Sequence, residues 1–335
     1  MRIFLALSVA VVTASLAPTA FASQVVSTSN VSDLSLAVNA KGEALVTYRT
    51  GSETVHLLAW GAINAIKPTT RRAQLAFKLD YAGGYGKYFK GSRSAQFLAR
   101  QFRSIQGSPG YLVDPVTKQL RELQLAASTY WKTGFNGGCA PYDGPALAWV
   151  VAACKAPDGS YWAVQRWQRK LPNYGLVPNA TQSANEVHLA HWRGAVPVLT
   201  ISTDWSWRKW DHLFGSFTYK GSPVFGFHVT PTGQPLDSFG RNLYVDTLDS
   251  AYGSGWKREN SFLTHNPTGV FCYSVNPHGS CPAGTGTQYR ATIIGPGVTP
   301  DVMWQGMTPG TFDPAADATK NTVIASLGDK LCRPN

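Results

Sequence analysis

Hydrophobic and polar residues alternate along much of this chain, which is the pattern of half-buried β-strands. The alternation is clearest in residues 74–81, where Leu75, Phe77, Leu79 and Tyr81 share one face. Similar patterns, separated by turn residues, predict three strands before it, at residues 34–38, 44–48 and 54–60. Four strands in so short a stretch indicate an antiparallel meander near the start of the chain.

The alternation resumes at residue 147 and predicts a hairpin of residues 147–154 and 161–168, joined by an Ala-Pro-Asp-Gly turn. Later strands are predicted at residues 186–192, 196–203, 213–219, 224–229, 242–248 and 289–294. Asp313 before Pro314 is a helix cap with a first-turn proline, and predicts a helix over residues 314–327. We expect a mainly β fold of antiparallel sandwich or jelly-roll-like layers, in one or two β domains, with a short C-terminal helix.

The first 22 residues break this pattern. Arg2 precedes a short apolar run, and the segment closes on Ala20-Phe21-Ala22. A charged start, an apolar core and an Ala-x-Ala end predict a secretory signal peptide cut after Ala22, with an uncleaved membrane anchor as the alternative. The apolar run is shorter than the roughly 20 residues that span a bilayer, and no later run is longer. We expect a chain that is secreted or associated with the cell envelope and has no transmembrane segment.

This organisation predicts five segments. They are a signal peptide at 1–22, a flexible N-terminus at 23–33, a β meander with a basic, less regular insertion at 34–132, a sandwich-like domain at 133–312, and a helix and tail at 313–335. The insertion includes a short helix expected at 94–103.

Composition and charge narrow the class of protein. Charged residues make up 15% of the chain and 12% are aromatic, which excludes a disordered protein. The net charge is +11, and its excess is concentrated between Lys67 and Lys132. This basic stretch would suit an anionic cell-wall polymer, or would serve only as a solvated surface. No nucleic-acid-binding motif is present, so we expect no nucleic-acid partner.

Five cysteines remain after the signal peptide. In an oxidising compartment, Cys139–Cys154 and Cys272–Cys281 are the natural disulfide pairs, and Cys332 is the odd one. The pairing of Cys281 also argues against a role as a catalytic nucleophile. There is no Cys-x-x-Cys pair, so the sequence predicts neither a zinc knuckle nor a thioredoxin-like site.

The most unusual local sequence is residues 204–212, with three tryptophans among polar groups. Exposed indole rings stack on the apolar faces of sugars, and carboxylates bind sugar hydroxyls. The alternative is that these rings cap a hydrophobic core. The residues expected to contact a glycan here are Trp205, Trp207, Trp210, Asp204, Asp211 and His212.

Two further groups of residues have the chemistry of a site. Alternation in residues 186–192 places Glu186 and His188 together on an exposed strand face, as a second ligand contact or as an ordinary polar surface. Asp246, Asp249 and Glu259 could supply the carboxylate pair of a glycoside hydrolase, or simply cap turns. Ca²⁺ prefers such oxygens, but the spacing matches no calcium loop, so we expect no metal site and no cofactor.

The sequence therefore favours an exported β protein that binds extracellular glycan or cell-wall material through its Trp- and Asp-rich loop, without catalysis. A polysaccharide-cleaving enzyme using Asp246, Asp249 and Glu259 is the first alternative. An exported scaffolding protein without a small ligand is the second. No nucleophile elbow, P-loop or dinucleotide-binding fingerprint is present. The pattern does not indicate an oligomeric state.

Overall fold

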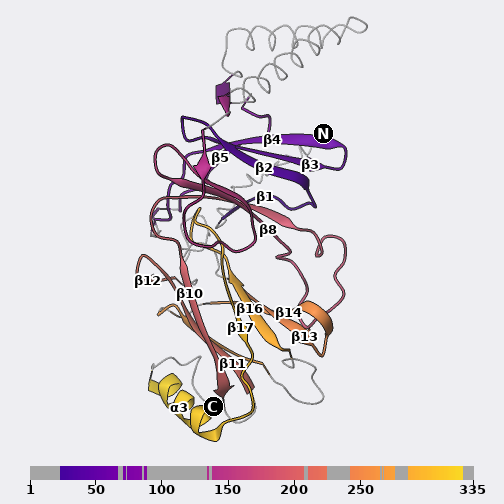
Figure 1. Cartoon of the computed structure of the whole chain (residues 1–335), viewed down its shortest axis with the longest axis vertical. Helices are drawn as coiled ribbons and strands as arrows, with labels where there is room; N and C mark the ends of the chain where they lie inside the picture. Colours follow the sequence, from indigo (N-terminus) through magenta and orange to yellow (C-terminus); the bar gives the residue numbers. More distant parts are fainter. Residues whose placement is uncertain are drawn as a thin grey trace, which may run out of the picture.

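The computed structural model describes residues 23–66, 71–72, 74–84, 87–88, 134–135, 138–206, 210–224, 242–264, 266, 268–275 and 286–326. As expected, these residues form a mainly β fold of antiparallel sheets, followed by one C-terminal helix. Four sheets pair into two sandwiches, stacked along the long axis of the molecule (Figure 1). No helix in the described part of the chain is long and apolar enough to cross a membrane.

The first sandwich occupies the upper half of Figure 1 and is built from strands β1 to β9. One sheet has the order β2-β3-β4-β5, with bounds Ser32–Val38, Ala44–Thr50, Glu53–Trp60 and Lys78–Asp80. The other has the order β1-β9-β8-β7-β6, with bounds Gln24–Ser27, Glu186–Trp192, Tyr161–Trp167, Val150–Lys155 and Ala140–Pro141. A single hydrophobic cluster fills the space between them.

This first core is made from both sheets, so it joins chain segments on either side of residue 132. Val46 and Leu57 from one sheet and Trp162 and Leu189 from the other are fully buried in it. Burying each such side chain contributes about 1.5–3 kcal/mol. The expected Cys139–Cys154 disulfide is present and ties β7 to the segment before β6. Cys272 lies on β15, and its expected partner Cys281 lies outside the described residues.

The second sandwich fills the lower half of Figure 1. In one sheet β11 (Trp210–Tyr219) lies between β10 (Val198–Ser206) and β15 (Val270–Val275). The end of β11 also pairs with the short strand β12 (Ser222–Pro223). The other has the order β14-β13-β16-β17, with bounds Gly253–Leu263, Asn242–Ser250, Gln288–Ile293 and Val302–Met307. Helix α3 (Pro314–Ser326) packs on β10. As predicted, Asp313 caps it by accepting the Ala315 N–H at 2.8 Å.

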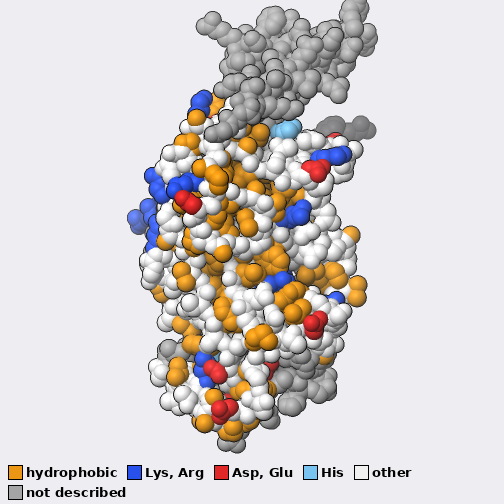
Figure 2. Space-filling model, in the orientation of Figure 1, with side chains coloured by type: hydrophobic (Ala, Val, Ile, Leu, Met, Phe, Trp, Pro, Cys, Tyr) orange, Lys and Arg blue, Asp and Glu red, His pale blue; other side chains and the backbone are white. Residues whose placement is uncertain are grey.

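One loop of the second sandwich is buried against the first. Residues 294–301, between β16 and β17, are all buried. A buried loop must satisfy its backbone polar groups internally. Here the Val298 carbonyl accepts the His191 N–H at 2.8 Å, and the Asp301 N–H donates to Gln165 Oε1 at 2.9 Å. Hydrophobic side chains gather down the centre of the face in Figure 2, from the first sandwich to the level where the two sandwiches meet.

Residues 74–81 are shorter as a strand than their alternation predicted. Only Lys78–Asp80 pair, as β5, because the Gln74 amide turns back to bond the backbone of Ile66 at 2.7 and 2.8 Å. Leu75 is 36% exposed and Tyr81 is 53% exposed, whereas Phe77 is buried in the first core and Leu79 is half-buried against it. The prediction of one half-buried face was therefore wrong at both ends.

Several strands lie where the sequence predicted none. The N-terminus expected to be flexible contains β1, which pairs with β9 from Gln24 to Ser27. β14, β15 and β17 were also missed. The helix expected at 94–103 and most of the strand expected at 224–229 lie outside the described residues.

Candidate functional site

The Trp- and Asp-rich segment forms the facing ends of β10 and β11. The Asp204 carboxylate lies 3.1 Å from the Lys320 ammonium of α3. Trp205 is half-buried: its Nε1 donates to the Gly310 carbonyl at 3.0 Å, and its ring meets Phe312 edge-on. These two residues hold the C-terminal segment against the sheet.

Asp211 and His212 are buried rather than presented to a ligand. Asp211 accepts the Tyr289 hydroxyl at 2.9 Å, and burial raises its pKa to about 6. Burial, together with the Lys320 charge, lowers the pKa of His212 to about 4. Residues 207–209, with Trp207, and the side chain of Trp210 lie outside the described part of the chain.

Glu186 and His188 lie on β9, where the sequence predicted an exposed polar face. That expectation was wrong: all seven residues of the strand are buried. The first sandwich covers one face of β9, and Ser23 and Asp301 contact His188 on the other. The alternation of β9 could not reveal this, because Asp301 is more than a hundred residues away in the chain.

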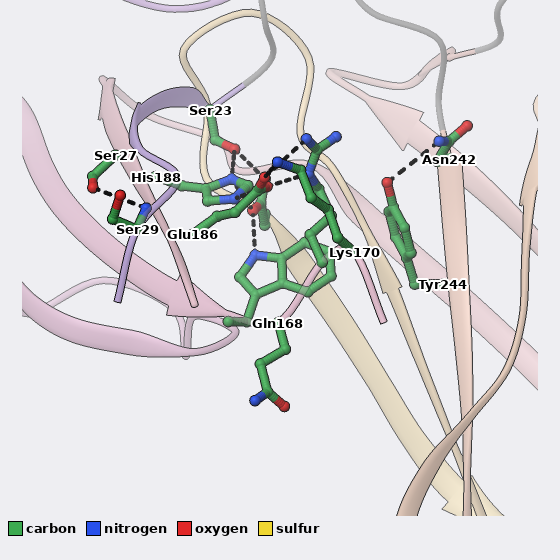
Figure 3. A network of polar contacts seen from close by, with 12 residues as sticks. Ser23, Ser27, Ser29, Gln168, Lys170, Glu186, His188, Asn242 and Tyr244 are labelled. Carbon is green, nitrogen blue, oxygen red and sulfur yellow. Dashed lines mark hydrogen bonds and ion pairs between the residues drawn. The ribbon is translucent and has the colours of Figure 1, made fainter. Parts of the chain in front are cut away.

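A continuous polar network surrounds His188 (Figure 3). Its Nδ1 lies 3.0 Å from both Ser23 Oγ and Asp301 Oδ2, and its Nε2 lies 3.6 Å from Glu186 Oε2. Burial opposes a charge on His188, but the carboxylates of Asp301 and Glu186 outweigh it and raise its pKa. Burial would likewise raise the pKa of Glu186, but hydrogen bonds from His188, Arg169 and Lys170 hold it well below its usual range.

The network has a hydroxyl, an imidazole and two carboxylates, which are the groups of many catalytic sites. The burial and the contacts of these side chains favour a structural role instead. Ser23, Glu186, His188 and Asp301 are each 0% exposed. Glu186 is also paired with Arg169 and Lys170, and a fully buried hydroxyl cannot be reached by a substrate. We assign the network to holding β9 and the buried loop together.

The three candidate acids do not meet in one place. Asp246 and Thr247 are consecutive on β13 and so face opposite sides of the sheet. Asp246 binds Arg258, whereas Glu259 lies on the Thr247 side, 3.5 Å from its hydroxyl, and is fully buried. Asp249 lies at the end of β13, where the pairing with β14 is irregular, and accepts the Gly255 N–H at 2.7 Å. The described residues also contain no cluster of three or more metal-ligating side chains.

The outer face of the β14-β13-β16-β17 sheet carries a set of groups that the sequence did not reveal. Strand pairing places residues in rows across this face, on the side opposite the second core. One row consists of Trp256, Leu248, Gln288 and Met307. The next consists of Arg258, Asp246, Arg290 and Gln305.

Arg290 lies between two tryptophan rings on this face. Its guanidinium carbon is 4.3 Å from the centre of Trp149 and 4.2 Å from the centre of Trp256. Trp149 comes from the segment before β7, and its Nε1 donates to Thr292 Oγ1 at 3.2 Å. Beside these rings, Gln305 donates to Gln288 at 2.9 Å. We call Trp149, Trp256, Arg290, Gln288 and Gln305 the tryptophan–arginine face.

The charges at this face do not balance. Asp246 accepts hydrogen bonds from Arg258 at 2.6 Å and from Arg290 at 2.9 Å, so two guanidinium groups share one carboxylate. Arg258 is buried, and donates its other N–H groups to the carbonyls of Arg169 and Gln168. Burial lowers the pKa of Arg290, although Asp246 opposes the change. Arginine stays protonated in proteins, so the cluster carries one excess positive charge.

Sequence reasoning missed this face because its members are scattered. Trp149 and Arg290 are far apart in the chain, and only the pairing of β13 with β16 brings Arg290 beside Asp246. The one available signal was the alternation of Trp256 and Arg258. The Gly-rich stretch directly before them predicts a loop, so this alternation was not taken as a strand. Comparisons of the chain with models of protein families, with curated proteins and with solved structures find no match.

Proposed function

We propose that this protein is a non-enzymatic, exported binder of acidic glycans, and that it binds them on the tryptophan–arginine face. The observation that carries the proposal is the excess positive charge of Arg290 between two half-buried tryptophans. Extracellular polymers that bear carboxylates or phosphates on sugar rings match both features. The site thus differs from the Trp- and Asp-rich loop that the sequence favoured.

The apolar part of the face supports sugar stacking. Trp256 is half-buried at the edge of a row whose last member, Met307, is 61% exposed. An indole ring presents a broad apolar surface that packs against the C–H groups of a pyranose. Gln305 is exposed and Gln288 is half-buried beside it, so amide groups are in place to bind hydroxyls. A sheet face of this kind suits an extended polymer.

The polar part of the face supports selection of an anion. Arg290 uses its Nε and Nη2 atoms on Asp246 within the described structure. A guanidinium has five N–H donors in a planar fork, so Nη1 remains to bind a carboxylate or phosphate. An anion would also offset the excess charge of the Asp246 cluster. Hydrogen bonds to charged groups contribute about 1.5–3 kcal/mol, or roughly 10- to 100-fold in affinity.

The alternative sites receive less support from the contacts. In the Trp- and Asp-rich segment, Asp204 is paired with Lys320, and Trp205 packs on Phe312. Asp246, Asp249 and Glu259 lie in three different environments, and no contact among them favours hydrolysis. The tryptophan–arginine face is therefore the part of the described structure on which a binding experiment should concentrate.

The test is affinity electrophoresis and titration against a polyuronate, a polymer with phosphate-linked sugars, and a neutral glucan. We expect retention by one or both acidic polymers and none by the neutral one. Arg290→Gln should weaken binding roughly 10-fold or more, and Trp256→Ala by a similar factor. Arg290→Lys should recover part of the affinity at low salt, because it keeps the charge but loses the planar fork.

Trp205→Ala is the matched control, since it removes an equally large ring from the other candidate site. It should leave retention unchanged in protein whose near-ultraviolet circular dichroism shows a folded state. If Trp205→Ala abolishes retention and Trp256→Ala does not, the site is on the β10–β11 hairpin. Equal binding of neutral and acidic polymers would remove the role of Arg290.

A further inference from the structure

Ser23, the residue that would begin the chain after cleavage at Ala22, is fully buried. Its hydroxyl donates to Asp301 and lies 3.0 Å from His188 Nδ1 (Figure 3). The next residue, Gln24, begins β1 and pairs with Leu189 of β9, so the position of Ser23 is fixed by the sheet. The first residues after a signal-peptide cleavage site are usually exposed and poorly ordered, so a buried first residue is unusual.

Asp301 has fewer cationic partners than Glu186, the other buried carboxylate of this network. Among the described residues it pairs with no Lys or Arg, and its one titratable cationic partner is His188. Glu186, by contrast, pairs with both Arg169 and Lys170. The carboxylate of Asp301 otherwise accepts hydrogen bonds from Trp167 Nε1 at 3.0 Å and the Gly295 N–H at 3.3 Å. A buried carboxylate with one cationic neighbour would gain from a second.

The backbone conformation of Ser23 also favours a chain that begins at this residue. Its φ is +28°, a value that non-glycine residues rarely adopt because the preceding carbonyl crowds the side chain. A first residue has no preceding carbonyl, so cleavage would remove this crowding. Three bonds separate the nitrogen of a serine from its Oγ, which places the two atoms about 3–4 Å apart. The α-nitrogen of Ser23 is therefore one side-chain length from the carboxylate that its hydroxyl contacts, and a freed amino group can turn toward that carboxylate.

We propose that cleavage between Ala22 and Ser23 creates a buried N-terminal ammonium that pairs with Asp301 and completes the junction between the two sandwiches. A processing peptidase adds water across the bond, which leaves a carboxylate on Ala22 and an amino group on Ser23 that takes up a proton. The ammonium gives Asp301 a second cationic partner besides His188. Processing thus stabilises the fold as well as releasing the chain.

The charged neighbours define the pH dependence. The ammonium would face Asp301, with His188 beside it and Glu186, Arg169 and Lys170 behind. A buried carboxylate partner raises the pKa of an α-amino group above its unfolded value of about 7.7–8.0. The stabilisation is therefore fully present below about pH 7.7 and is lost as pH rises through the higher, folded-state pKa.

The test compares two chains made by cleaving a removable fusion, one beginning at Ser23 and the other retaining Ala22. We expect the chain that begins at Ser23 to unfold about 5 °C higher at pH 7. The difference should shrink above the folded-state pKa of the amino group. In an Asp301→Asn background, which keeps the shape of the side chain without its charge, the two N-termini should give the same midpoint. Equal midpoints in the wild-type background would overturn the proposal.

A chemical probe gives a readout that does not depend on stability. Periodate rapidly oxidises an N-terminal serine that has a free amino group beside its hydroxyl. In the chain that begins at Ser23, we expect oxidation to be at least 10-fold slower in the folded state than in denaturant, as followed by mass spectrometry. Equal rates would show an exposed terminus. Mature protein recovered from an exporting host should begin at Ser23, and any other first residue would contradict the proposal.

Discussion

At the scale of single residues, Asp211 and His212 are neighbours on β11 whose pKa values are shifted in opposite directions. Burial raises the pKa of Asp211 to about 6, and burial with the Lys320 charge lowers that of His212 to about 4. As pH falls from 6.5 to 4, the folded state gains stability from protonating Asp211 and loses it by keeping His212 neutral. The two contributions nearly cancel in the intact chain.

Separating the pair should expose each contribution. In His212→Gln only the Asp211 effect remains, so stability relative to wild type should rise as pH falls from 6.5 to 4, by up to about 3 kcal/mol. Asp211→Asn should show the opposite slope. Denaturant unfolding at several pH values measures both. Parallel pH profiles for wild type and the two variants would contradict the assignment.

The residue scale is also where the sequence was least informative. Glu186 and His188 were correctly placed on one face of a strand, but their burial depends on Ser23 and Asp301, which only the folded chain brings together. Arg290 attracted no attention in the sequence because an isolated arginine in a strand is ordinary. Its environment comes from Trp149 and Trp256 on other segments.

At the scale of elements, the sequence predicted helices and strands correctly where contacts between neighbouring residues decide the structure. The helix α3 begins at Pro314 as predicted, because the Asp313 carboxylate accepts the N–H groups of Ala315 and Ala316. β14 was missed since its start, Gly253-Ser254-Gly255, is typical of a loop. Its pairing with β13 over the full strand overrides that local preference.

The cap of α3 gives a prediction at this scale. Asp313→Ala should cost about 1 kcal/mol of the unfolding free energy, because two N–H groups lose their acceptor. Asp313→Asn should cost much less, since an asparagine side chain also caps helices well. Urea unfolding followed by circular dichroism measures both. Equal losses in the two variants would indicate that the charge of Asp313, rather than its cap, matters.

At the scale of the whole molecule, the buried loop of residues 294–301 joins the two sandwiches. Its glycine at 297 has φ +59°, and an added Cβ would lie 2.9 Å from Ala65. Asp301 at its end contacts β9 through His188 and β8 through Trp167. The molecule should therefore unfold as one cooperative unit, although it contains two separate cores.

Removing the Asp301 carboxylate should uncouple the unfolding of the two sandwiches. We expect one calorimetric transition in the wild-type protein and two in Asp301→Ala, because the variant loses the contacts with Trp167 and His188. Asp143→Ala is the control: it removes an exposed carboxylate that pairs with Lys155 and should leave one transition. A single unshifted transition in Asp301→Ala would show that the loop does not couple the cores.

The buried loop also sets an order of events during synthesis. The first sandwich is built from residues before 193, yet Val298 is part of its core and Asp301 bonds its central strands. A ribosome must therefore finish almost the whole chain before the first sandwich can close. For a chain that crosses a membrane before folding, as we propose here, this delay keeps the N-terminal half extended and able to pass through a translocation channel.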